Sequence, residues 1–339
     1  MNKRRFLTTF MAIALTCLAT TALAQTSKPK TTGQTTKPTL GTVQMPGDNG
    51  KLKTTYQLGE KGNELHFTLE SASFAMRYPA PEDVYLARKE QRLLVLNFTV
   101  HNPLNKEMTL GQRAFKFTVV SPDDQNFEFN GYVLETTKKT RVQQSLKPAQ
   151  KVKCTIVIPI HEVGPVNKII VQRGPAPVLR YDLTDKVGKM TSIFSKDGID
   201  AAAKGGSVEL GKPFDMSAFD VTIISAVRTM DKIKTYAPST DYMYVVVTLS
   251  FTNKLQRPSP LGFQYFAPEL RDAGGSLHSW NRDLLALLSD TTLGQEVEPD
   301  SSITGRYYFH VPKAAAVGPL KLKLIDSSSM REVTLDIAP

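Results

Sequence analysis

The stretch Arg92-Leu93-Leu94-Val95-Leu96-Asn97-Phe98-Thr99-Val100-His101-Asn102 decides the fold of this chain. From Leu94 to Val100 the apolar residues fall on every second position, which is the period of a β-strand that buries one face. The stretch Met243-Tyr244-Val245-Val246-Val247-Thr248-Leu249-Ser250-Phe251-Thr252-Asn253 repeats this alternation. The closing asparagines, Asn102 and Asn253, are 151 positions apart (253 − 102). The pattern therefore predicts two equivalent strands.

Further landmarks follow in the same order in both halves of the chain. They are the turns Ser121-Pro122-Asp123-Asp124 and Asp272-Ala273-Gly274-Gly275, the loops Leu146-Lys147-Pro148 and Val297-Glu298-Pro299, and the pairs Gly164-Pro165 and Gly318-Pro319. Their offset stays between 151 (299 − 148) and 154 (319 − 165). Unrelated domains would not keep one order at one spacing, so the sequence predicts a tandem duplication.

The fold class predicted for each copy is all-β. About seven or eight short alternating strands, separated by turn signals, fill each copy, and no amphipathic helical segment lies between them. We expect two tandem immunoglobulin-like antiparallel β-sandwiches. The predicted organisation is a signal peptide (1–24), a disordered tail rich in Thr, Lys and Pro (25–53), a first sandwich (54–183), a linker (184–206) and a second sandwich (207–338).

The N-terminus has the three parts of a secretory signal. Lys3, Arg4 and Arg5 precede an apolar run, and Ala22-Leu23-Ala24 ends it, so we expect cleavage after Ala24. Cys17 follows Thr16 rather than a small residue, which disfavours lipid attachment. No later apolar run approaches the ~20 residues of a membrane helix. The mature chain is therefore expected outside the cytoplasm, in the periplasm or secreted.

Charge and cysteine content limit the partners. The formal net charge of +10 falls to +7 (10 − 3) when the three basic residues of the signal leave, which favours a protein or an anionic envelope polymer. No basic run is interleaved with aromatic residues, so nucleic acid is not expected. Cys154 is the one cysteine after cleavage. Its place in an alternating strand favours buried packing, with a reactive thiol as the alternative.

The repeated landmarks resemble a known family. A strand that closes on Asn, a loop that ends in Pro, and a strand that ends in an apolar-Pro pair occur in both copies, at Asn102, Pro148 and Ile158-Pro159 and at Asn253, Pro299 and Val311-Pro312. This order resembles the telokin-like, immunoglobulin-like domains of unknown function in secreted and envelope proteins of bacteria. The resemblance covers most of 54–183 and 207–338. It implies an extracytoplasmic β-sandwich with a non-enzymatic role.

Motifs for catalysis are missing from the sequence. The five histidines are scattered and none has zinc-ligand spacing, and no phosphate-binding, dinucleotide or nucleophile-elbow motif occurs. Asp123, Asp124 and Asp272 lie in turns, where aspartate is favoured for backbone reasons. We therefore predict no catalytic residue, no metal site and no cofactor.

A binding surface is predicted at Trp280, Arg282 and Tyr132. Trp280 is the one tryptophan of the chain, and Trp, Tyr and Arg dominate binding hot spots. The alternative is that Trp280 and the leucines after it close the second core. The basic stretch Lys138-Lys139-Thr140-Arg141 allows two interpretations, a solvated loop or a contact to an anionic polymer.

These observations favour a non-catalytic exported protein whose two modules contact a protein or an envelope polymer. Two modules on one chain gain effective concentration when both engage. One alternative is a periplasmic chaperone or protease inhibitor that offers a strand edge or a loop. Another is a cell-wall glycan hydrolase, or its accessory module, which would need two facing carboxylates.

Overall fold

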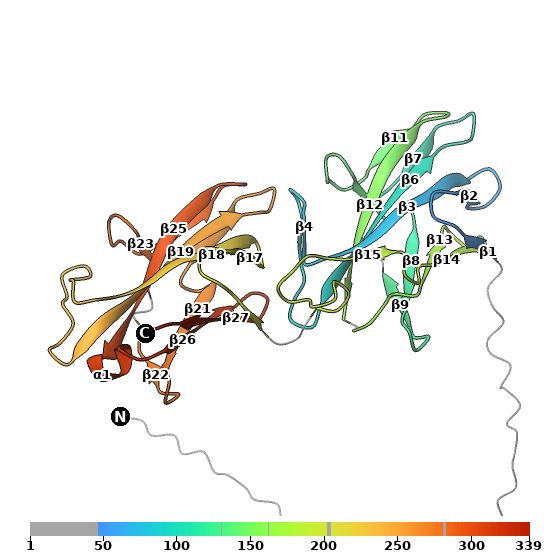
Figure 1. The fold of residues 1–339 in the computed structure, drawn as a ribbon. Helices are drawn as coiled ribbons and strands as arrows, with labels where there is room; N and C mark the ends of the chain where they lie inside the picture. Colours follow the sequence, from blue (N-terminus) through green and yellow to red (C-terminus); the bar gives the residue numbers. More distant parts are fainter. Residues whose placement is uncertain (1–46, 130, 162, 202–204, 281–282) are drawn as a thin grey trace, which may run out of the picture. The chain divides into compact units, whose positions relative to one another are not determined.

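The computed structural model describes residues 47–339 except 130, 162, 202–204 and 281–282. The predicted signal peptide, its cleavage site at Ala24 and residues 25–46 of the predicted tail lie outside this part. Met45–Pro339 form one compact unit. Nearly all elements are strands, and α1 (Lys313–Ala316) is a single turn (Figure 1). Within the described residues no helix is long and apolar enough to cross a membrane.

The first sandwich has two main sheets. One has the order β1-β14-β13-β8-β9, formed by β1 (Gly47–Gly50), β14 (Val178–Asp182), β13 (Lys168–Gln172), β8 (Lys116–Val120) and β9 (Asn126–Phe129). The other has the order β10-β12-β6-β3-β15, formed by β10 (Leu134–Glu135), β12 (Lys151–Ile160), β6 (Arg92–His101), β3 (Leu65–Ala75) and β15 (Val187–Gly188). β2 (Thr55–Leu58) also pairs with β3, β4 (Arg77–Pro79) forms a hairpin with β5 (Val84–Leu86), and β7 (Met108–Leu110) pairs with the distant β11 (Gln144–Leu146).

The second sandwich repeats this plan. One sheet has the order β16-β27-β26-β21-β22, formed by β16 (Gly206–Ser207), β27 (Arg331–Ile337), β26 (Leu320–Asp326), β21 (Phe266–Asp272) and β22 (Leu277–His278). The other has the order β17-β18-β19-β25-β23, formed by β17 (Pro213–Met216), β18 (Phe219–Thr229), β19 (Tyr242–Asn253), β25 (Ser302–Pro312) and β23 (Leu285–Ala286). β20 (Ser259–Gly262) pairs with β24 (Gly294–Val297).

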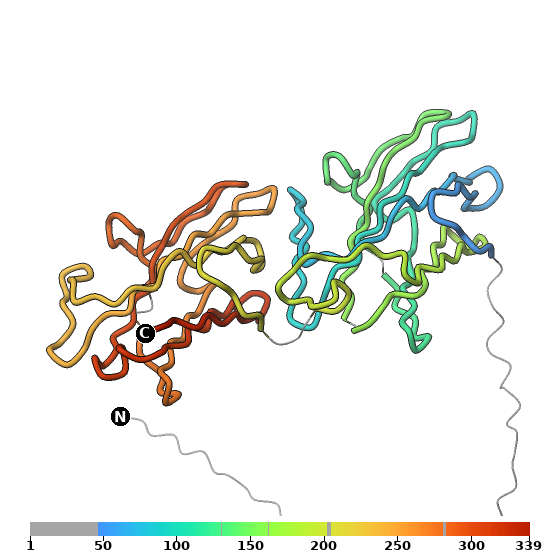
Figure 2. The backbone as a smooth tube through the Cα atoms, in the orientation of Figure 1, coloured from blue at the N-terminus to red at the C-terminus, as the bar shows by residue number. Residues whose placement is uncertain are grey.

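The two sandwiches share the strand order of their main sheets, and the path of each can be followed in Figure 2. Among the described residues, β15 and the β4–β5 pair of the first sandwich have no counterpart in the second. The two sandwiches share an irregularity as well. The register of β3 against β6 shifts between Leu69 and Ser71, and that of β18 against β19 shifts between Ile223 and Ser225. A β-bulge at equivalent places is a feature of one ancestral design. The predicted tandem all-β fold is thus confirmed.

Each sandwich has its own apolar core, built by the alternation seen in the sequence. In β6, the residues from Leu94 to Val100 that were expected to face inward are buried, and so are their counterparts from Val245 to Phe251 in β19. Burying each side chain of this kind contributes about 1.5–3 kcal/mol. Cys154 lies in the first core, as the strand pattern predicted.

The outer faces of β6 and β19 are partly covered too, which the alternation did not indicate. The hairpin of β4 and β5 packs over Val95, and Ile233 packs over Val246. Both valines are buried although they are on the outward phase of their strands. A short segment after β3 or β18 therefore folds back on its own sheet.

Two predicted boundaries differ from the structure. Gly47–Gly50 was assigned to the tail but pairs in parallel with β14, because backbone pairing needs no apolar side chain and leaves no hydrophobic pattern. The predicted linker contains β15 and the first residue of β16, and it also places Met190 in the first core and Phe194 in the second. Scattered apolar residues in a stretch of mostly Gly, Lys, Asp and Ala carry no period from which burial can be predicted.

Candidate functional site

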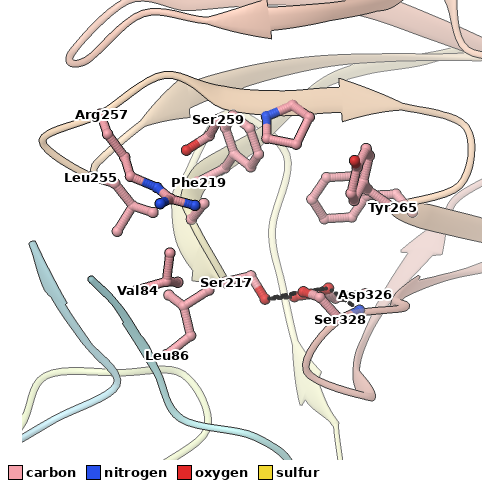
Figure 3. A pocket seen from close by; sticks show the side chains of 13 residues that line it. Val84, Leu86, Ser217, Phe219, Leu255, Arg257, Ser259, Tyr265, Asp326 and Ser328 are labelled. Carbon is pink, nitrogen blue, oxygen red and sulfur yellow. Dashed lines mark hydrogen bonds between the residues drawn. The ribbon is translucent and has the colours of Figure 1, made fainter. Parts of the chain in front are cut away.

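An apolar cleft lies where the β4–β5 hairpin meets the second sandwich (Figure 3). It has a volume of about 140 Å³ and is partly open to solvent. Its walls are mainly apolar, formed by Val84, Leu86, Ala218, Phe219, Leu255, Pro260, Tyr265 and Phe266, with Ser217, Arg257, Ser259, Asp326 and Ser328 as the polar residues. Four separate segments of the chain build it.

The hairpin reaches the cleft because its apolar residues are shared between two cores. Met76 and Leu86 pack against the core of the second sandwich, while Ala80 and Ala87 pack on the outer face of the first. Arg77 fixes this arrangement. Its guanidinium donates to the carbonyl oxygen of Phe219 at 3.0 Å and forms an ion pair with Asp220.

A buried arginine holds the other side of the junction. Arg331 is 4% exposed, and its Nη2 donates to the carbonyl oxygens of Arg88 and Gln91, each at 2.8 Å. Burial lowers the pKa of Arg331 to about 10, so it remains charged at neutral pH. The backbone N–H of Lys89 donates to the carbonyl oxygen of Ser329 at 2.7 Å. These bonds join the β5–β6 connection to the β26–β27 turn.

The carboxylate of Asp326 forms the polar end of the cleft, and its oxygens already accept hydrogen bonds from the protein. Asp326 is 1% exposed and accepts hydrogen bonds from the hydroxyls of Ser217 and Ser328 (Figure 3). The hydroxyl of Ser329 and the backbone N–H of Ser328 also donate to it. Its lone pairs are occupied by donors of the chain itself, so it is not placed to take a proton from a substrate. None of the lining residues is a histidine. The lining serines Ser217 and Ser328 therefore have the carboxylate of Asp326, but no histidine, beside them.

One positive charge lies at the rim of the cleft. Arg257 is half-buried, and its Nε has no hydrogen-bond partner among the described residues. Arg141 donates to Asp83 at 2.6 and 3.0 Å, and this bidentate pair, with a smaller contribution from Arg257, holds the pKa of Asp83 below its ordinary value. Near the cleft, the carboxylate of Asp83 is thus paired with Arg141, while the Nε of Arg257 is buried without a hydrogen-bond partner among the described residues.

The predicted binding residues do not line this cleft. Trp280 is half-buried, and its ring meets that of Tyr307 edge to face at 5.5 Å, so its contacts are those of a residue at the end of the second core. Arg282 lies outside the described residues. Tyr132 belongs to the first sandwich, and the guanidinium of Arg141 lies 3.8 Å from its ring centroid. The structure does not bring Trp280 and Tyr132 together in one site.

The basic stretch around residue 140 has partners within the protein. Arg141 is paired with Asp83, and Lys138 lies 2.9 Å from the carboxylate of Glu135. The ammonium group of Lys139 lies 5.7 Å from the ring of Tyr78. These contacts favour the interpretation as a solvated loop.

Two histidines that are far apart in the sequence are cross-strand neighbours. His66 in β3 pairs with His101 in β6, and their Nδ1 atoms are 3.2 Å apart. Burial, and then the charges of His66 and Lys151, lower the pKa of His101. Within the described residues, no group of three or more His, Cys, Asp or Glu side chains is arranged to hold a metal ion.

Sequence reasoning missed the cleft because its residues share no motif. They meet only through the fold of the hairpin and the turns of the second sandwich. The available signal was Val84 and Leu86, two apolar residues two positions apart in a Pro-rich loop. That spacing indicates a short strand with one apolar face, and a face of this kind needs a surface to pack on.

Comparisons with known proteins match the second sandwich and the fold. The model of a family described as a domain of unknown function (DUF4352) matches residues 208–332. No curated protein matches the chain. An uncharacterised β-sandwich protein of Clostridium difficile is similar at 14% identity and a TM-score of 0.32, over 40% of this chain and 95% of that one.

Two further solved structures are similar to parts of the chain. A lipoprotein candidate of Bacillus subtilis has 20% identity and a TM-score of 0.29, over 38% of this chain and 39% of its own. A secreted protein of Mycobacterium tuberculosis has 12% identity and a TM-score of 0.29, over 40% of this chain and 97% of its own. At these scores, the likenesses say nothing about activity.

Proposed function

We propose that this protein is a non-catalytic, extracytoplasmic binding protein whose junction cleft receives one apolar side chain of a protein partner. The observation that carries the proposal is the cleft itself, about 140 Å³ of mainly apolar lining that opens to solvent. We further propose that the two sandwiches are telokin-like, immunoglobulin-like domains. The equivalent strands that end at Asn102 and Asn253 support this assignment.

Volume decides between a small molecule and an anchor side chain. Pockets that enclose a drug-sized ligand measure about 300–1,000 Å³. A dry apolar cavity of about 150 Å³ holds a benzene-sized group. At about 140 Å³, this cleft fits a single Leu, Ile, Met or Phe side chain. Such a side chain in a pocket is how hot-spot residues of protein partners are seated.

Charge at the rim defines the partner further. Arg257 is half-buried in the lining of the cleft, and the positive charge of its guanidinium favours a carboxylate of the partner nearby. The positive formal net charge of the chain favours encounter with acidic segments. The partner segment should therefore combine one large apolar residue with an acidic residue close by.

The chemistry of the site supports a non-enzymatic role. The lining contains a single carboxylate, Asp326, and its oxygens already accept four hydrogen bonds of 2.9 Å or less. A glycan hydrolase needs a pair of carboxyl groups roughly 5–10 Å apart across its cleft. The buried Cys154 thiol, whose pKa burial raises to about 12, lies in the core rather than at the cleft.

Peptide selection tests this function. A peptide library displayed on phage is selected against the mature protein, and the selected peptides are measured by fluorescence anisotropy. We expect them to share one large apolar residue beside an acidic one. Binding should weaken about tenfold or more in Val84→Asp, which places a charge in the cleft, and should weaken less in Arg257→Gln.

The matched control is Val163→Asp, because Val163 is also an exposed valine and does not line the cleft. This variant should bind the selected peptides as the unaltered protein does. Selected peptides without a recurrent apolar residue, or equal binding by the Val84 and Val163 variants, would contradict the proposal.

A further inference from the structure

The second sandwich has an unpaired strand edge at residues 224–229 of β18. β17 pairs with β18 only from Phe219 to Thr222. The backbone N–H of Gly211 donates a hydrogen bond to the carbonyl oxygen of Ile223. Beyond this point β19 is the one strand that pairs with β18 in the described part of the chain. Among the described residues, no strand lies on the other side of the backbone there.

The equivalent edge in the first sandwich is occupied. β15 pairs in parallel with β3, Val187 opposite Ala72 and Gly188 opposite Ser73. Aligning the bulge of β3, which ends at Ser71, with that of β18, which ends at Ser225, shows which residues of the two strands are equivalent. Ala72 and Ser73 therefore correspond to Ala226 and Val227, at an offset of 154 (226 − 72). The fold accepts a parallel strand at this position, and the first sandwich fills it from its own chain.

The unpaired edge exposes large apolar side chains to solvent. Ile224 and Val227 are 48% and 50% exposed, and Met230, which follows the strand, is 45% exposed. Residues 224–227 contain neither a charge nor a proline, although these are the usual protection of an exposed edge. Arg228 does not protect it, because its guanidinium donates to the carbonyl oxygens of Ala316, Gly318 and Ala338.

We propose that residues 224–229 capture an extended segment of a partner polypeptide, which adds to the sheet as a parallel strand in the manner of β15. Main-chain hydrogen bonds would supply the affinity, and Ile224, Val227 and Met230 would contact its side chains. A Cβ on Gly188 would lie 3.3 Å from the Cβ of Ser73. The residue opposite Val227 should accordingly be glycine or another small residue, preceded by a β-branched one.

The parallel direction distinguishes this partner from a second copy of the chain. Two β18 edges related by a two-fold axis can pair only antiparallel, because a parallel pair about such an axis would set identical backbone groups opposite each other, donor against donor. The occupant seen in the first sandwich runs parallel to its neighbour. The edge is also separate from the junction cleft, whose lining includes no residue of 224–229. Either proposal can fail without the other.

The test uses a peptide with the sequence of residues 183–190, which contains β15, added at millimolar concentration to the ¹⁵N-labelled mature protein. We expect shifts in the backbone amide signals of residues 224–229. A peptide methylated on the backbone nitrogens of Val187 and Gly188 should bind about tenfold or more weakly, because it lacks the donors of the ladder. This comparison does not depend on the folding of a protein variant.

A protein variant supplies the second arm. Val227→Lys places a charge on the edge and should weaken peptide binding to a similar extent, while Val163→Lys should leave it unchanged. Absence of shifts at residues 224–229, shifts confined to Ala72 and Ser73, or equal binding of the methylated peptide would overturn the proposal. A dimer in sedimentation that Val227→Lys dissociates would assign the edge to a second copy and would also overturn it.

Discussion

Asn102 and Asn253 make the same hydrogen bonds in the two sandwiches. The side-chain nitrogen of Asn102 donates to the carbonyl oxygens of Lys106 and Leu146, and that of Asn253 donates to those of Arg257 and Val297, all at 2.8 Å. Each side-chain oxygen accepts the backbone N–H two residues later, at 3.0 and 2.9 Å. Each asparagine is fully buried and ties the end of a central strand to two loops.

This network predicts matched losses of stability. Asn102→Ala and Asn253→Ala should each lower the free energy of unfolding by about 3 kcal/mol, because two carbonyl oxygens, one of them buried, and one N–H lose their partner. Urea unfolding followed by circular dichroism measures the change. Asn97→Ala is the matched control, since Asn97 is half-buried, and it should cost less than Asn102→Ala. A loss below about 1 kcal/mol at either buried site would contradict the assigned role.

Trp280 is predicted to act through packing. Trp280→Ala should lower stability by about 2 kcal/mol, because the half-buried ring loses its edge-to-face contact with Tyr307. Trp280→Phe should retain most of that stability. Thermal unfolding measures both variants. If Trp280→Ala instead leaves stability unchanged and abolishes binding of the selected peptides, the surface predicted at Trp280 is correct and the packing role is wrong.

The Cys154 thiol should be unreactive in the folded protein. Burial raises its pKa to about 12, so only about one thiol in ten thousand is ionised at pH 8. Ellman's reagent should therefore react with one thiol per chain in 6 M guanidinium chloride and scarcely at all in buffer. Rapid labelling of the native mature protein would contradict the buried position.

The free energy of unfolding should depend on pH through the ionisation of Asp83. Its pKa is lowered in the folded state, chiefly by the hydrogen bonds from Arg141, whereas in the unfolded chain it is about 3.9. Its contribution is therefore present above about pH 4 and is lost as the pH falls through the lower folded value. Asp83→Asn should cost about 1 kcal/mol at pH 7 and progressively less below pH 4.

Urea unfolding at pH 7 and pH 3 measures this dependence. Glu128→Gln is the control, because Glu128 pairs with Lys116 at an exposed site and such pairs contribute little. An Asp83→Asn cost that is the same at both pH values would show that Asp83 acts through something other than its charge.

The sequence by itself determined the strand faces and the duplication. The alternation from Leu94 to Val100 and from Val245 to Phe251 predicted which side chains are buried, because in a strand every second side chain faces the core. The repeated Asn and Pro landmarks predicted one fold in two copies. Local period and turn chemistry are properties of neighbouring residues, so they can be read from the order of residues alone.

Only the tertiary structure decided where distant segments meet. The cleft beside Val84 joins four segments, His66 meets His101 across a strand pair, and the edge at Val227 is recognised as open only because β15 fills its counterpart. For Trp280 the sequence left a binding surface and closure of the second core as alternatives, and in the structure its ring packs on Tyr307. Strand register, bulges and loop packing set these neighbours, and they are fixed by contacts between residues far apart in the chain, which no local pattern records.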